Sequence, residues 1–97
     1  MVSIYMEDTM SLDTIFASAI ELLAKEQEKD LKAMAHEIIG LSTPDVSIRE
    51  FRRITRPDKQ GRYRSLTLRE AYEFSRAVGK SMDDIIAYGL TRADMKK

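Results

Sequence analysis

Four arginines on one side of a short predicted helix are the residues of this chain best suited to bind a ligand. They are Arg49, Arg52, Arg53 and Arg56, spaced i, i+3, i+4 and i+7. On a helical wheel they fall within roughly 100° of arc, opposite Ile48, Phe51 and Ile54. The planar guanidinium group binds phosphate, or guanine O6 and N7, through two parallel hydrogen bonds. The spacing predicts a helix face that binds a polyanion; a solvated face, or pairing with the acidic amino-terminal half, would use the same arginines.

Positive charge is concentrated around this segment. Residues 49–69 carry eight basic and two acidic side chains, whereas residues 1–48 carry three basic and nine acidic ones. Over all 97 residues the formal charge is zero, with 16 side chains of each sign. Such an uneven distribution is expected of a protein that presents one surface to a polyanion.

The loop predicted after this helix, residues 57–65 with the sequence PDKQGRYRS, is also basic. Lys59, Arg62 and Arg64 are candidate phosphate contacts. Tyr63 lies between two of these cations, a position suited to stacking on a base or lying along the sugar-phosphate backbone. Packing of Tyr63 against the following helix is an equally good interpretation.

Residues that could support catalysis or metal binding are sparse. The chain has no cysteine and one histidine, His36, which lies near an apolar stripe. Asp83 and Asp84 are adjacent, so on a helix they point about 100° apart and cannot flank one substrate. The four glycines are far apart and form no phosphate-cradling loop. We therefore expect a protein that is not an enzyme and has no metal, cofactor or small-molecule site.

Two stretches of the amino-terminal half have apolar residues at helical spacing. They predict one helix over residues 12–25, capped by Ser11, and another over residues 31–39, ended by Gly40. Periodicity alone is also compatible with one continuous helix. We favour a break near residues 27–30, because the intervening KEQEKD contains no apolar residue.

The residues that carry the arginines are predicted to form the third helix. Turn chemistry at residues 41–46, LSTPDV, precedes it, and Ser47 is expected to open a helix over residues 47–55 that Pro57 stops.

Two further helices are predicted in the carboxyl-terminal part. Thr67 and Glu70 match a capping box, which begins a helix that ends at Gly79. Ser81 is expected to cap a last helix that ends near Gly89.

These elements predict an all-α, five-helix domain over residues 11–89, with an amino-terminal arm at 1–10 and a tail at 90–97. The arm alternates apolar and polar residues at its start, as a short strand or a dimer-contact segment does, and disorder fits equally well. No stretch without charge exceeds seven residues, and the amino end shows no secretion signal. We therefore expect a cytoplasmic protein that is not bound to a membrane.

Residues 66–86, LTLREAYEFSRAVGKSMDDII, resemble the closing helices of Cro/C1-type (lambda-repressor-like, XRE family) helix-turn-helix domains. Ala77-Val78-Gly79 stands where the family has Ala-Leu-Gly, and residues 80–85 match its Val-Ser-Leu-Asp-Glu-Leu. Upstream, Met34-Ala35 resembles the family's Leu-Ala, and residues 46–54 resemble its recognition helix. A turn at residues 40–46 that is longer than usual and a longer, more basic loop suggest a divergent branch of the kind carried by phages and mobile elements.

The resemblance implies that helix 47–55 lies in the major groove of double-stranded DNA. Ser47, Arg49, Arg52 and Arg53 would approach base edges or nearby phosphates, while Arg56 and the Lys59–Arg64 loop would contact phosphate. It implies a sequence-specific transcriptional regulator, most simply a repressor, that acts as a homodimer reading two half-sites. The alternative is a helical adaptor, or an antitoxin-type module, whose arginine face binds an acidic partner protein.

Overall fold

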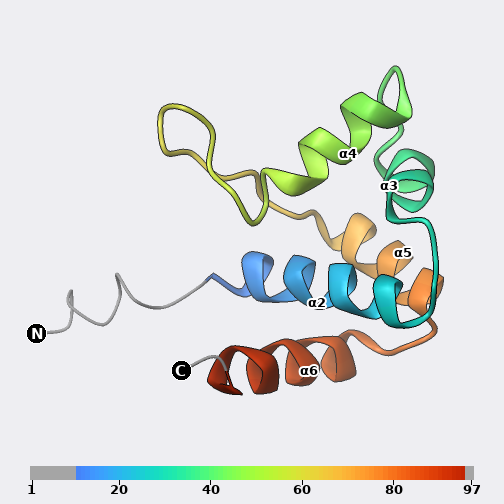
Figure 1. Cartoon of the computed structure of the whole chain (residues 1–97), viewed down its shortest axis with the longest axis vertical. Helices are drawn as coiled ribbons and strands as arrows, with labels where there is room; N and C mark the ends of the chain where they lie inside the picture. Colours follow the sequence, from blue (N-terminus) through green and yellow to red (C-terminus); the bar gives the residue numbers. More distant parts are fainter. Residues whose placement is uncertain (1–10, 96–97) are drawn as a thin grey trace, which may run out of the picture.

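The computed structural model describes residues 11–95, and this part of the chain consists of five α-helices without a strand (Figure 1). The helices are α2 (Leu12–Glu26), α3 (Leu31–Ile39), α4 (Pro44–Arg52), α5 (Leu68–Val78) and α6 (Met82–Met95). None of these helices has the length and hydropathy needed to cross a membrane. The expected all-α, five-helix architecture is confirmed, whereas the expected arm at residues 1–10 lies outside the described residues.

The predicted break between the first two helices is confirmed. The α2 helix ends at Glu26, and Glu28 adopts a left-handed conformation with φ of 58°. Asp30 then caps α3, because its side chain accepts the N–H of Ala33. The side-chain amide of Gln27 donates to the carbonyl oxygen of Val78 at 2.9 Å, which fixes this turn to the end of α5.

The α4 helix begins three residues earlier than the sequence analysis predicts. Thr43 is its N-cap and accepts the N–H of Val46, and Pro44 occupies the first turn, where its missing N–H costs no hydrogen bond. Only residues 40–43 separate α3 from α4, so the expectation of a long turn is wrong. The predicted bounds of 47–55 are replaced by Pro44–Arg52, with turns over residues 53–55.

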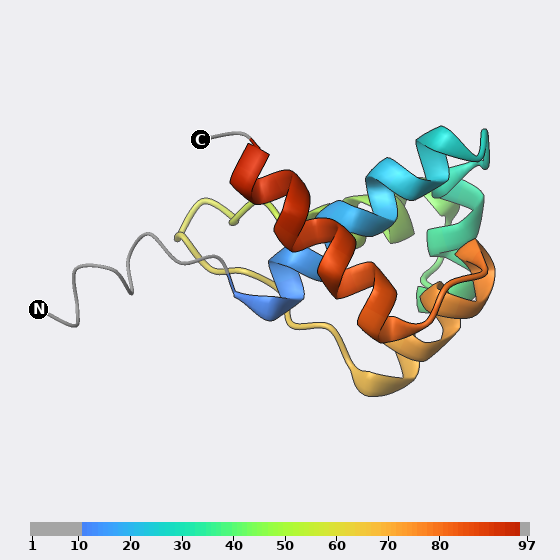
Figure 2. The ribbon, with the colours of Figure 1, turned by 90° about the horizontal axis from the view of Figure 1, so that it is seen from below.

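The core is built around α2. Its buried face includes the fully enclosed Ala17, Ala19 and Ile20, and the small alanines let neighbouring helices approach closely. The α6 helix crosses one side of α2, as Figure 2 shows, while α4 lies on the other side, beyond α5 and next to α3 (Figure 1). This arrangement leaves the outer side of α4 free of contact with α2 and α6.

The last helix continues through Gly89 to Met95, so the helix end expected near Gly89 is wrong. Gly89 is buried against α2, and a Cβ atom added to it would lie 2.7 Å from both the carbonyl oxygen and Cγ2 of Ile15. Real Cβ atoms are not found so close to another heavy atom, so only glycine allows α6 to pack at this distance. Gly89 is therefore a contact residue of the α2–α6 interface and not a helix terminator.

A Gly89→Val substitution is expected to lower the free energy of unfolding by about 1–3 kcal/mol, because the added side chain forces α6 away from α2. Chemical denaturation followed by circular dichroism measures the change. Ala87→Val, at an exposed position of the same helix, is the matched control and should cost no more than about 0.5 kcal/mol. Equal losses in the two variants would contradict the close packing of Gly89.

Candidate nucleic-acid interface

The inner side of α4 and the turn after it attach the arginines to the core. Ile48, Phe51 and Ile54 are buried, and the ring of Phe51 lies 5.0 Å from that of Phe74 on α5. The hydroxyl of Thr14 on α2 donates to the carbonyl oxygen of Ile54 at 2.8 Å in a buried hydrogen bond. The segment is thus fixed to two other helices, and its outer side can present charge with little freedom to move.

Three of the four predicted arginines form the exposed face. Arg49, Arg52 and Arg56 are exposed, and none makes an ion pair with a residue in the described part of the chain. We call these three residues the arginine face. Arg49 and Arg52 lie on α4 at spacing i, i+3, and Arg56 follows the turns of residues 53–55.

Ser47 is not part of this face, which corrects its expected role at base edges. It is completely buried, and its Oγ accepts the N–H of Leu41 at 3.0 Å and lies 3.1 Å from Nδ1 of His36. Because α4 begins at Pro44, Ser47 falls one turn inside the helix, on the side that faces α3. Ser47 therefore fastens the α3–α4 turn, and His36 has a structural partner.

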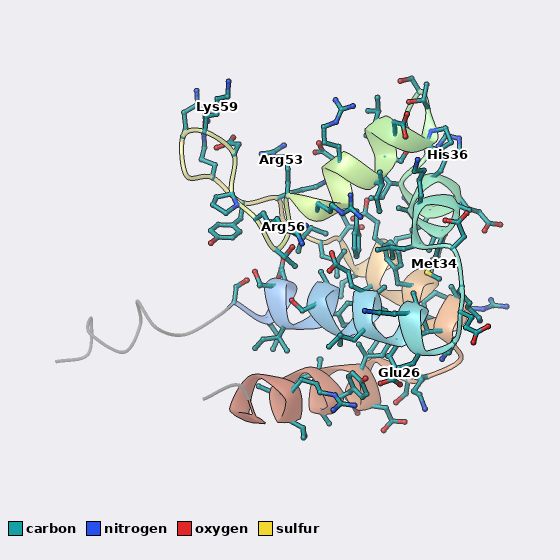
Figure 3. The ribbon with its side chains drawn as sticks, in the orientation of Figure 1. Glu26, Met34, His36, Arg53, Arg56 and Lys59 are labelled. Carbon is teal, nitrogen blue, oxygen red and sulfur yellow. The ribbon has the colours of Figure 1, made fainter. Side chains whose placement is uncertain are left out.

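The basic loop, residues 57–65, has a defined turn at its tip. The carboxylate of Asp58 accepts the N–H groups of Gln60 and Arg62, both at 2.9 Å. The backbone closes the same turn, because the N–H of Asp58 donates to the carbonyl oxygen of Arg62. Lys59 and Arg62 are exposed on this turn and make no ion pair within the described residues. Figure 3 shows Lys59 at the tip, pointing away from the helices.

Tyr63 is 57% exposed, so the interpretation in which it packs against the following helix is not supported. Its two neighbours differ in exposure: Arg62 is exposed, whereas Arg64 is largely enclosed. The tyrosine ring is therefore presented beside the free cations of the loop.

Arg64, expected to contact phosphate, is instead bound inside the protein. Its guanidinium donates to both carboxylate oxygens of Glu70, at 2.9 and 3.0 Å, and to Glu50 at 3.1 Å. The hydrogen bonds from Arg64 hold the pKa of Glu70 below its ordinary value of 4.5, against the burial that alone would raise it. This arginine has no free hydrogen-bonding edge to offer a ligand of the arginine face.

Arg53, expected near base edges, is also engaged by carboxylates. Its guanidinium lies 3.2 Å from Glu50 and 3.5 Å from Asp58, and its side chain is 36% exposed. Figure 3 shows it between the loop and α4. The structure thus divides the predicted site residues into free cations on α4 and the loop tip, and internally paired ones between them.

Sequence reasoning missed the contacts of Arg64 with the acidic residues of this region. Glu50 and Asp58 are the two negative charges near enough in the sequence to neutralise the arginines locally, and both pair with Arg53. Glu70 was identified only as part of the capping box, which is confirmed with Thr67. Glu50 lies three residues before Arg53, a spacing that predicts a helical ion pair. The contacts of Arg64 span 14 and 6 residues of chain, so no local pattern could reveal them.

An apolar groove of about 160 Å³ lies between the beginnings of α2 and α5 and one side of α6. Of the residues that line it, only Asp13 is titratable, and its carboxylate already accepts the N–H of Leu66. Within residues 11–95, no cluster of three or more acidic or histidine side chains is arranged to hold a metal ion. The arginine face and the basic loop tip are therefore the candidate binding surface.

Comparison with known proteins gives no match for this chain, neither among protein-family models nor among curated proteins or solved structures.

A Ser47→Ala substitution is expected to lower the free energy of unfolding by about 1 kcal/mol, because it removes the acceptor of the Leu41 N–H. Urea denaturation measures this loss, with Ser42→Ala, at an exposed position of the same turn, as the control. Equal stability of the two variants would contradict the role of Ser47 in fixing this turn.

An Arg64→Gln substitution is expected to cost about 2 kcal/mol of stability at pH 7, because it leaves the carboxylate of Glu70 buried without its cation. Because the folded pKa of Glu70 is lowered, its stabilising effect is complete above the unfolded value near 4.5 and is lost as the pH falls through the folded value. The stability difference between the wild type and Arg64→Gln should therefore shrink below pH 4.5. Urea titrations at several pH values measure it, and a constant difference down to pH 2 would contradict the pair.

Proposed function

We propose that this protein binds double-stranded DNA through α4, with α3, the four-residue turn and α4 acting as a helix-turn-helix unit of the Cro/C1 type. The observation that carries the proposal is the arginine face: three exposed arginines without partners in the described residues, two on α4 and one just after it. The opposite side of this segment is fixed to the core. The attachment means that little backbone conformational entropy is lost when this segment meets a rigid ligand.

The dimensions of α4 agree with a duplex as the ligand. A helix with its side chains is about 10–12 Å across, and the major groove of B-form DNA is about 12 Å wide and admits one helix. The nine residues of α4 extend over about 13.5 Å, so a few adjacent base pairs are within reach. With Ser47 buried, Arg49 and Arg52 are the residues proposed to reach base edges or the phosphates beside them. Arg56, Lys59 and Arg62 then contact phosphate, with Tyr63 beside them.

The role that follows is that of a transcriptional regulator, most simply a repressor, because occupancy of an operator is enough to block transcription. A homodimer is part of this proposal, since one short helix contacts few base pairs and two half-sites a helical turn apart provide useful affinity. The proposal includes no catalytic step and no cofactor.

Arg49→Ala and Arg52→Ala are each expected to weaken binding to duplex DNA by about tenfold or more and to reduce the salt dependence by about one unit of slope. Fluorescence anisotropy with a pool of random duplexes, titrated between about 50 and 200 mM salt, measures both quantities. Selection from the same pool should enrich a site with two related halves.

Arg76→Ala is the matched control, because Arg76 is an exposed arginine on α5, outside α4 and the basic loop, and its loss changes the net charge equally. It should change affinity by less than about twofold. Similar losses in all three variants would overturn the assignment of α4. An absence of binding at the lower salt would favour the alternative function, a helical adaptor that binds an acidic partner protein. A pull-down with this protein as bait would then search for that partner.

A further inference from the structure

Carboxylates and arginines alternate in an unbroken series between α5 and the tip of the basic loop. The series runs Glu70, Arg64, Glu50, Arg53, Asp58, and each consecutive pair lies between 2.9 and 3.5 Å apart. Asp58 extends it by accepting the backbone N–H groups of Gln60 and Arg62 at the loop tip. We call these five residues the ion-pair chain.

The end of the ion-pair chain at α5 is the most buried. The exposed fraction of the side chain lies between 27% and 36% at Asp58, Arg53 and Glu50, and falls to 19% at Arg64 and 5% at Glu70. The inner end is also held by the backbone, because the N–H of Arg64 donates to the carbonyl oxygen of Arg53 at 3.0 Å. The loop is thus attached to the end of α4 and to the first turn of α5 at the same time.

The cations without an ion-pair partner in the described residues lie on either side of this ion-pair chain. Arg49, Arg52 and Arg56 project from α4 and its end, and Lys59 and Arg62 project from the loop tip, with Glu50 and Asp58 between the two groups. Glu50 contacts no free cation and is shared by Arg53 and Arg64. Figure 1 shows α4 and the loop side by side on the same side of α2.

From this arrangement we infer that Glu50 and Asp58 are positioning residues, which hold the loop tip as a second phosphate-binding element at a fixed place beside α4. In this arrangement Lys59 and Arg62 bind the DNA backbone at phosphates outside the groove that α4 enters. Fixing the tip in advance removes most of the ordering cost that a free loop of this length would impose on binding. The inference rests on the proposed function and adds the device that places its second contact.

A double-mutant cycle tests this inference, because it cancels the general effect of removing one negative charge. The double substitution Lys59→Ala/Arg62→Ala is measured in the wild type and again in a Glu50→Gln background, by the same anisotropy titration. Glu50→Gln is suited to this purpose because Arg53 keeps Asp58, and Arg64 keeps Glu70, as a remaining partner.

In the wild-type background the double substitution should lower affinity strongly, since each phosphate contact is worth about eightfold at 0.1 M salt, and should reduce the salt slope by about two units. In the Glu50→Gln background both effects should be at least threefold smaller, because the link between Arg53 and Arg64 is lost and the tip is held less firmly beside α4. Asp58→Asn, which keeps the acceptor oxygen of the turn and removes the charge, should act in the same way and serves if Glu50→Gln does not fold. Glu73→Gln is the control, because it removes a carboxylate that pairs with Arg69 outside the ion-pair chain. It should leave the effect of the double substitution on affinity unchanged.

Equal loop effects in all backgrounds would overturn the positioning role while leaving the proposed function intact. No effect of the double substitution in the wild type would overturn the second contact itself. If Arg49→Ala and Arg52→Ala also leave binding unchanged, it is the proposed function that fails, so the two failures are distinguishable.

Discussion

The segment between α4 and α5 takes its shape from the guanidinium of Arg64, which two carboxylates share. Glu70 is 5% exposed, and a charge taken so far out of water is costly unless it is paired and hydrogen-bonded. Arg64 meets that condition with two hydrogen bonds, and Thr67 contributes its N–H through the capping box. The remaining guanidinium edge binds Glu50, so the same cation fixes the end of α4. Without it, the fifteen residues that join the two helices would lose the side-chain link between α4 and α5.

Pairing also resolves the repulsion that the sequence builds into α4. Four arginines at helical spacing destabilise a helix by a few tenths of a kcal/mol for each close pair of like charges. Glu50 and Asp58 neutralise Arg53, which would otherwise lie closest to the other arginines. Three free cations remain, spread over the length of the helix and the turn after it. The division between paired and free charge therefore serves folding first, and it leaves a surface that can bind a polyanion.

Local patterns predicted most of the helices, because helical periodicity and capping residues act over a few positions. The capping box at Thr67 and the helix end at Gly40, whose φ of 74° suits glycine, are of this kind. The start of α4 was missed although Thr43-Pro44 carries the signal of an N-cap followed by proline, because proline was interpreted as part of a turn. Gly89 was misread in a similar way, since only the position of α2 makes it a packing residue.

The candidate site was predictable in composition but not in its connections. Helical spacing identified the arginine face, and the basic loop was evident from its residues. The burial of Ser47 and the pairing of Arg64 depend on contacts between elements that are distant in the chain, so residue type and spacing could not reveal them. Tyr63 had two open interpretations, and its exposure follows from the turn that Asp58 holds.

Separated charge on a molecule with zero formal charge gives this protein an electric dipole. The basic loop and the turn between α2 and α3 lie at opposite ends of α2 (Figure 1). In residues 25–30 of this turn, three carboxylates outnumber two lysines by one charge. In the field of a charged rod such a molecule feels little net force but a torque, which rotates its positive end towards the rod before contact. Since the field decays over about 8–10 Å at physiological salt, this alignment acts only in the final approach. A neutral dipole of this kind gains orientation at encounter without the general attraction that would hold a uniformly basic protein on every polyanion in the cell.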